Sequence, residues 1–238
     1  MRIKPQIDHA VIVLVGRFNP AIFQPAWFAL HKMLGEKEAE TAEIKVIIGD
    51  VSQFKLDQFE IQVLPERFTI TSLDVHPEHI KDLVISCFGQ SLPHTPVRAM
   101  GINRLVHFDA GGFEIRDRVG NRLAPKDAWG TWGKEIDAAP REPEGARGGM
   151  VSIVMRQSSR SDGHKGHVQA KVEPSALVTN NAGIFVDVND HFDLSAPEQA
   201  VQDASSAVAL LEKNWEASLK RSATIIDQIM ALAEECRT

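Results

Sequence analysis

The sequence predicts an α+β fold built from two βαβββα repeats, which form largely antiparallel sheets with helices packed on one face and a long C-terminal helix. Two observations carry this prediction. An apolar, β-branched run opens each half, at residues 9–18 and 97–108. Similar helical and strand-like segments then follow in the same order, and both predicted first helices contain an Ala-Trp pair, which ends at Trp27 and at Trp129. Self-similarity of this kind indicates an internal repeat. Chance similarity between such short matches is the alternative.

The first half begins with a strand at residues 9–18, because this run is too short to span a membrane and is typical of a strand buried on both faces. A helix is predicted over residues 21–34, since apolar residues recur there at three- and four-residue spacing. This stripe consists of Phe23, Trp27, Leu30 and Leu34, and it predicts a buried Trp27. The three strands expected next cover residues 44–48, 54–64 and 68–73. Pro77 then begins a helix that extends to Phe88, because proline fits the first turn of a helix.

The second half repeats this order. Residues 97–108 are expected to form its first strand and residues 125–136 its first helix. The three following strands are predicted over residues 150–157, 167–172 and 183–194. The last helix runs from Pro197 to Glu235, because neither proline nor glycine interrupts this segment. The halves cover residues 1–95 and 96–238, and they are expected either as two domains or as one compact unit.

Composition limits the classes of function. The chain has 238 residues and a net charge of −6, whereas broad binding to nucleic acids or anionic membranes needs a basic surface. No apolar stretch is long enough for a transmembrane helix, and the N-terminus lacks the apolar core of a signal peptide. Cys87 and Cys236 are expected as reduced thiols, with one disulfide as the alternative. These features together predict a cytoplasmic protein.

The strand at mid-chain carries a short motif that contains Gly101, Asn103 and Arg104. With the duplicated order and the long terminal helix, these residues resemble a sporadically distributed bacterial family whose members show a Gly-Leu-Arg-Tyr-x-Asn-Arg-Ile-like strand. The chain departs from that pattern at the other positions. The family has no established biochemical role, so the resemblance implies no catalytic residues. Its patchy distribution is similar to that of bacterial defence and conflict systems.

The strand at residues 183–194 alternates between an apolar and a polar face. Its polar side chains are Asp187, Asn189, His191 and Asp193. Neighbours on one strand face lie about 7 Å apart, a separation that two side chains can bridge to a metal. His107 joins these candidate ligands if its strand pairs with this one. A solvated strand face is the simpler interpretation, so we expect no metal and no cofactor here.

The last helix carries an apolar seam at heptad-like spacing, which is typical of a helix that packs against a partner helix. The seam consists of Val201, Ala204, Val208, Leu211, Trp215, Ser218, Ser222, Ile225, Ile229 and Leu232. One interpretation is that the whole seam packs on the chain's own sheet. The other is that a partner protein, or a second copy, contacts this helix through Trp215, Ile225, Ile229 and Leu232.

Three functions are compatible with these patterns. No phosphate-binding glycine loop, nucleophile elbow or Cys-x-x-Cys motif is present, which favours a non-catalytic interaction or assembly protein that acts in a complex. The first alternative is a metal-dependent hydrolase that uses Asp187, Asn189, His191 and Asp193. The second is a regulator that binds a small ligand in a cleft between the halves, where pockets often form.

Overall fold

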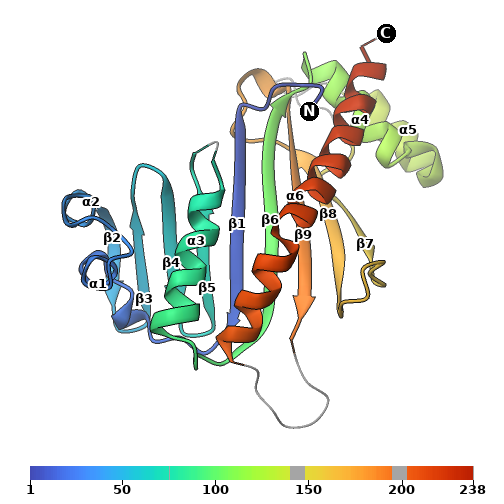
Figure 1. The fold of residues 1–238 in the computed structure, drawn as a ribbon. Coiled ribbons are helices and arrows are strands. Elements are labelled where there is room, and N and C mark those ends of the chain that lie inside the picture. Colours follow the sequence, from blue (N-terminus) through green and yellow to red (C-terminus); the bar gives the residue numbers. More distant parts are fainter. Residues whose placement is uncertain (75, 140–147, 195–202, 238) are drawn as a thin grey trace.

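A nine-stranded antiparallel sheet forms the centre of the protein (Figure 1). The computed structural model describes residues 1–74, 76–139, 148–194 and 203–237. Strand order across the sheet is β2-β3-β4-β5-β1-β6-β9-β8-β7. The strands are β1 (Ile7–Gly16), β2 (Glu43–Ile48), β3 (Val51–Lys55), β4 (Phe59–Leu64), β5 (Arg67–Ser72), β6 (Val97–Asp109), β7 (Ile153–Gln157), β8 (Gly166–Pro174) and β9 (Gly183–Asp193). The α+β class and the antiparallel pairing are therefore confirmed.

Apart from the long C-terminal helix, the described helices are short. They are α1 (Pro25–Leu30), α2 (Glu36–Glu40), α3 (Glu78–Ser86), α4 (Phe113–Leu123), α5 (Gly130–Ala138) and α6 (Ala204–Glu235), with short helical turns η1 (Pro20–Ile22), η2 (Cys87–Ser91), η3 (Lys126–Trp129) and η4 (Thr179–Asn181). The long helix α6 crosses β6 and β9, and α3 lies beside it over β1 and β5 (Figure 1). Within the described part of the chain, no helix has both the length and the apolar character needed to cross a bilayer.

The two halves of the chain meet in the middle of the sheet. β1 and β6 pair antiparallel, with Ile12 opposite Ile102. The last strand of each half pairs with the first strand of that half, β5 with β1 and β9 with β6. Among the described residues, four strands follow β1 in the first half, whereas three follow β6 in the second. The duplication therefore stays a prediction, and the sheet continues without a break across the boundary at residue 95.

The strand expected over residues 54–64 is a hairpin instead. β3 ends at Lys55 and β4 begins at Phe59, and the Leu56 N–H donates a hydrogen bond of 2.8 Å to the Phe59 carbonyl across the turn. Phe54 and Phe59 are both buried in the same core cluster. An unbroken strand would place these two residues on opposite faces. The turn resets the alternation, so both rings enter the core.

The helix expected over residues 21–34 is broken into pieces. Pro25 has no N–H and disfavours a helical conformation in the residue before it. The turn η1 therefore ends before Pro25, which occupies the first position of α1. As a result Phe28 is fully buried, whereas Leu30 is 78% exposed and Trp27 is only partly buried. The predicted burial of Trp27 is thus wrong in degree, because the register of α1 brings Phe28 toward the sheet.

The helix expected over residues 125–136 is also divided. The turn η3 ends at Trp129, and Gly130 adopts the left-handed conformation with φ 57° at the start of α5. Trp129 is 59% exposed, so its surroundings differ from those of Trp27. The helix α4 is absent from the sequence-based prediction, because charged residues occupy most of its turns and only Val119 and Gly120 are buried.

Two hydrophobic clusters fill the space between the sheet and its helices. The first cluster includes Ile12, Phe68, Phe88 and Trp215. The second includes Val106, Val186, Ile226 and Met230. The helix α6 contributes to both, its N-terminal part to the first and its C-terminal part to the second. Between these parts, the buried faces of α6 carry Ser218 and Ser222, so a polar belt separates the two clusters.

The apolar seam of α6 matches the prediction only as far as Ser222. Beyond it, the fully buried residues are Ile226, Met230 and Ala233. Ile225, Ile229 and Leu232 are partly buried and pack at the margin of the second cluster. A straight α-helix drifts by about 20° per heptad relative to a strict seven-residue repeat, which accounts for the shift by one position. Residues 197–202, including Val201, lie outside the described residues.

Candidate interaction face

The sheet has one face that the described helices do not use for their cores. The helices α1, α3 and α6 pack on the face of Ile12 and Ile102, and α4 packs on the same face near Val106. We call the opposite face the open face; it carries Val11, Asn103 and Asn189. These three side chains belong to neither core cluster. The open face is therefore a surface for which the described fold supplies no covering layer.

The strand register places the open-face side chains in rows that cross the whole sheet. One row runs from β2 to β7 and consists of Glu43, Lys55, Glu60, Thr71, Val11, Asn103, Asn189, Gln169 and Arg156. The adjacent row includes Val13, Gly101, His191 and His167. Directly opposite residues in an antiparallel pair have Cβ atoms about 5 Å apart. The centre of the open face, over β1, β6, β9 and β8, thus forms a continuous strip of amide, imidazole and aliphatic side chains.

The predicted metal candidates all lie on the open face, but the register separates them. Asp187, His191 and Asp193 come from β9, and His107 comes from β6. His107 stands opposite Phe185, whereas His191 stands opposite Gly101, which is six residues along β6. At about 3.4 Å per residue this places His107 about 20 Å from His191. Among the described residues no group of three or more His, Cys, Asp or Glu side chains is arranged to hold a metal ion.

The histidines of the open face make ring contacts instead. The His107 ring stacks on Phe185 at 4.4 Å between centroids, and its Nδ1 lies 2.7 Å from the Ser175 hydroxyl. His167 and His191 stack on each other at 4.6 Å. Burial lowers the pKa of His107, His167 and His191, and the same cause lowers the pKa of His9 on β1. These rings are therefore neutral at neutral pH.

Three oxygen acceptors of the open face are withdrawn from solvent and have no hydrogen-bond partner among the described residues. They are Asn103 Oδ1, Asn189 Oδ1 and Asp187 Oδ1. Burial raises the pKa of Asp187, against the nearby charge of Lys171. A buried acceptor that lacks a donor costs about 1–3 kcal/mol. This part of the molecule is accordingly less stable than a fully paired surface.

Gly101 makes room for two of these acceptors. A Cβ atom at this position would lie 3.0 Å from Asn103 Oδ1 and 3.4 Å from Asn189 Oδ1. The first distance is shorter than an ordinary carbon–oxygen contact, so a larger side chain would displace the amides. The Gly-x-Asn spacing on β6 thus has a structural reason: the glycine and the asparagine share one face, two residues apart.

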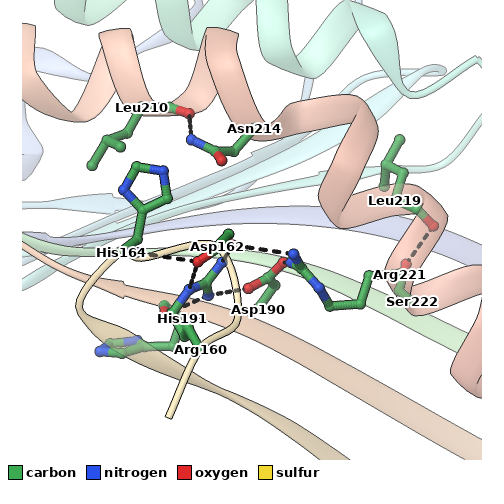
Figure 2. Close-up of polar contacts among 10 residues, drawn as sticks. All are labelled: Arg160, Asp162, His164, Asp190, His191, Leu210, Asn214, Leu219, Arg221 and Ser222. Carbon is green, nitrogen blue, oxygen red and sulfur yellow. Dashed lines mark hydrogen bonds and ion pairs between the residues drawn. The ribbon is translucent and has the colours of Figure 1, made fainter.

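A buried ion network lies on the other side of β9 (Figure 2). Asp190 accepts hydrogen bonds from Arg160 on the β7–β8 connection and from Arg221 on α6. The side chains of Arg160 and Asp190 are each 1% exposed. Asp162 accepts from Arg160 at 3.0 and 2.5 Å and from Arg221 at 3.1 Å. Because Arg160 donates to it, the pKa of Asp162 is well below its usual value.

This network joins three segments that are distant in sequence. The Arg160 guanidinium also stacks over the Phe192 ring at 4.0 Å and donates to the His191 carbonyl at 3.0 Å. Arg221 belongs to the stretch of α6 that holds Ser218 and Ser222. The small serine side chains are consistent with the space that two guanidinium groups need beneath the helix. The polar belt between the two hydrophobic clusters therefore contains ion pairs that connect the β7–β8 loop, β9 and α6.

A cavity of about 220 Å³ opens between α3 and α6, above β1 and β6. Its lining residues are Asp8, Ala10, Asp74, Pro77, Arg104 and Leu219. Arg104 donates to both carboxylate oxygens of Asp8, at 2.8 and 2.7 Å. The motif residue Arg104 thus points to the helix side of the sheet, whereas its neighbour Asn103 lies on the open face. The cavity is small beside ordinary ligand pockets, which begin near 300 Å³.

The predicted partner residues of α6 have different environments. Trp215 is 2% exposed and packs in the first cluster, so almost none of its side chain is accessible to a partner. Ile225, Ile229 and Leu232 keep part of their surface accessible at the edge of the second cluster. Their contact with a partner stays a prediction.

Several residues of the face and the network are missing from the sequence-based analysis. His167 and His9 enter it only as the first residues of predicted strands, over residues 167–172 and 9–18. Arg160 and Arg221 have no spacing relation to Asp190 that a single sequence reveals. The alternation of β9 does separate Asp190 from Asp187, and this signal alone could have marked Asp190 as a buried acid that needs a cationic partner.

Neither protein-family models nor curated proteins match this chain. The resemblance to a bacterial family therefore depends on Gly101, Asn103, Arg104 and the order of elements.

Proposed function

We propose that this protein is a non-catalytic interaction protein that acts in a protein complex, and that it binds a folded protein partner through the open face over β6, β9 and β8. The observation that carries this proposal is the group of three unpartnered acceptors, Asn103 Oδ1, Asn189 Oδ1 and Asp187 Oδ1. A docked protein would supply the missing donors once these side chains rotate toward it, because the three oxygens are withdrawn from solvent in the free chain. The resemblance described above is the basis for a setting in bacterial defence or conflict systems.

The surroundings of these acceptors favour recognition over catalysis. The nearby histidines are neutral and stack on other aromatic rings, and His107 also contacts the Ser175 hydroxyl. Val13 and Leu105, both partly exposed, add aliphatic surface among the polar groups. An apolar centre with satisfied polar contacts around it is typical of a protein interface. We expect a partner that presents amide or hydroxyl donors, because the strip mixes aliphatic side chains with acceptors and neutral rings.

The test uses the full chain, purified from its native host, with quantitative mass spectrometry of whatever protein is retained. We expect a stoichiometric partner with wild type and its loss in Asn189→Arg, which places a large cation in the centre of the strip. The matched control is Gln62→Arg, on β4 of the same face but outside the strip. Circular dichroism shows whether both variants fold. Equal retention by wild type and folded Asn189→Arg would contradict the proposal.

A second function, binding of a small ligand, has one observation in its favour. The cavity between α3 and α6 contains the Asp8–Arg104 pair and lies where the two halves of the chain meet. A ligand there would be small and polar, given the volume and the charged lining. Thermal stabilisation of wild type, but not of Arg104→Met, by members of a polar metabolite panel would identify such a ligand.

A further inference from the structure

The two edge strands of the sheet differ in how they are protected. β2 forms one edge and β7 the other. An edge strand presents unpaired backbone N–H and C=O groups, which favour pairing with another strand. The register of β2 shifts between Ile44 and Val46, as in a β-bulge, and such irregularities hinder pairing. β7 pairs with β8 in unbroken register over all of its residues, and its outer edge is correspondingly regular.

Two side chains of β7 and one just before the strand are apolar and exposed. Met155 is 68% exposed and Val154 51%, and Val151, just before the strand, is 81% exposed. The strand contains neither lysine nor proline, the residues that natural edge strands use against association. A regular edge with this surface is suited to strand addition.

We propose that β7 pairs with β7 of a second copy, antiparallel about Met155, so that two sheets join into one. The sequence of the strand is compatible with itself in this register. Met155 faces Met155, Val154 faces Arg156, and Ile153 faces Gln157. No like charges stand opposite each other, which would disfavour pairing. The Arg156 guanidinium is already held by Gln169 Oε1, at 3.0 and 2.7 Å, and therefore does not compete for the edge.

A second copy fits this edge because both sides of the contact are the same strand, related by a two-fold axis. An isologous two-fold interface requires that one surface match itself, and the register about Met155 fulfils this condition with the two Met155 side chains at its centre. The inference goes beyond the proposed function, because it concerns an edge and not the open face. Its consequence is that the open faces of two copies become one continuous surface.

Disulfide trapping tests the register directly. Directly opposite residues of an antiparallel pair have Cα atoms about 4.5–5.5 Å apart, within the range that a disulfide spans. Met155→Cys should therefore form a covalent dimer under mild oxidation. The native thiols Cys87 and Cys236 are buried and do not interfere. In the control Gln157→Cys, the two thiols would be about 14 Å apart along the strands and should not link. Linking of neither variant, or of both equally, would overturn the proposal.

Light scattering supplies the second measurement. The wild-type chain should have the mass of a dimer, and Met155→Lys should have the mass of a monomer, because two ammonium groups would meet at the two-fold axis. Ile48→Lys, at the exposed end of β2, should remain dimeric. Met155 is exposed in the single chain, so its substitution should leave the fold intact, as circular dichroism would verify. A wild-type monomer at all concentrations, or a dimer unaffected by Met155→Lys, would refute this pairing and would leave the open-face proposal unchanged.

Discussion

Arg160 and Asp190 form an ion pair whose two side chains are each 1% exposed, although they lie on different segments and 30 residues apart in sequence. Arg221 of α6 completes the contact from the helix side. Taking charges out of water is costly unless each is paired. The stability of the sheet–helix interface therefore depends on all members of this network together.

Removal of the Asp190 carboxylate should strongly lower the free energy of unfolding. Asp190→Ala leaves the buried Arg160 guanidinium with only Asp162, which is partly exposed, as an anionic partner, and breaking a buried pair costs about 3–5 kcal/mol. Urea denaturation followed by circular dichroism measures the change in the free energy of unfolding. The natural control is Asp187→Asn, three residues away on the other face of β9. Because burial raises the pKa of Asp187, its neutral replacement should keep or raise the unfolding midpoint. Equal effects of the two substitutions would show that the network does not stabilise the fold.

Stability should fall when the pH decreases below about 6.5. The pKa values of His9, His107, His167 and His191 are lowered in the folded chain from 6.5. Each ring therefore binds fewer protons when folded than when unfolded, so acid favours the unfolded state between 6.5 and the lowered pKa. The contribution is fully present above 6.5 and is lost progressively below it.

Urea midpoints at about pH 7.5 and about pH 5.5 measure this effect. The double variant His167→Gln with His191→Gln should show a smaller decrease than wild type, since it lacks two of the titrating rings. Asp187 has the opposite effect on stability: because its pKa is raised, its contribution decreases as the pH rises above 3.8. Measurement in an Asp187→Asn background removes that contribution. An identical pH dependence in wild type and the double variant would contradict the assignment.

Two adjacent isoleucines of α6 should respond differently to truncation. Ile226 is fully buried in the second cluster, so Ile226→Ala should cost about 2–5 kcal/mol. Ile225 lies at the margin of that cluster, so Ile225→Ala should lower the free energy of unfolding by less. Thermal unfolding of the two variants makes the comparison. A larger loss at Ile225 would mean that the predicted heptad register continues to the end of the helix.

The same helix allows a test of the predicted partner contact. Ile225→Asp combined with Ile229→Asp should leave the domain folded if the accessible parts of these side chains face a partner. Loss of a complex in light scattering, with an unchanged circular dichroism spectrum, is the expected result. A double variant that unfolds would assign both residues to the core alone.

The first helix offers a comparison of two aromatic residues. Phe28 is fully buried against Phe54 and Phe23, and Phe28→Ala should cost about 3–5 kcal/mol. Trp27 is only partly buried, so Trp27→Ala should cost less despite its larger ring. The two unfolding free energies, measured under the same conditions, decide between them. The reverse order would contradict the register of α1, which brings Phe28 and not Trp27 into the core.

Local sequence patterns were sufficient for the strands near the middle of the sheet. The alternation of β9 predicts which of its residues face the core, and the structure agrees along the whole strand. The runs that became β1 and β6 are β-branched, and this composition favours strands whatever their partners. The sequence-based prediction was wrong where a proline or a turn interrupted the periodicity of a helix or a strand. Pro25 interrupts a helical stripe, and the turn after Lys55 resets a strand whose apolar residues read as continuous.

The candidate interaction face was predictable only strand by strand. Asp187, Asn189 and His191 are recognisable as one polar face, because alternation is a property of the strand itself. Their neighbours Asn103, His167 and Gly101 come from other strands, and the register that brings them together depends on long-range pairing. The same holds for the β7 edge, since its position at the end of the sheet follows from the order of all nine strands.

The sequence by itself determined the α+β class, the identity of most strands and the long terminal helix, because these follow from periodicity and composition within short segments. Only the tertiary structure decided that His107 is distant from His191, that Trp215 belongs to the core, and that Asp190 is paired with two arginines. Each of these facts is a distance between segments that are far apart along the chain. Such distances are set by strand register and by the packing of α6 across the sheet.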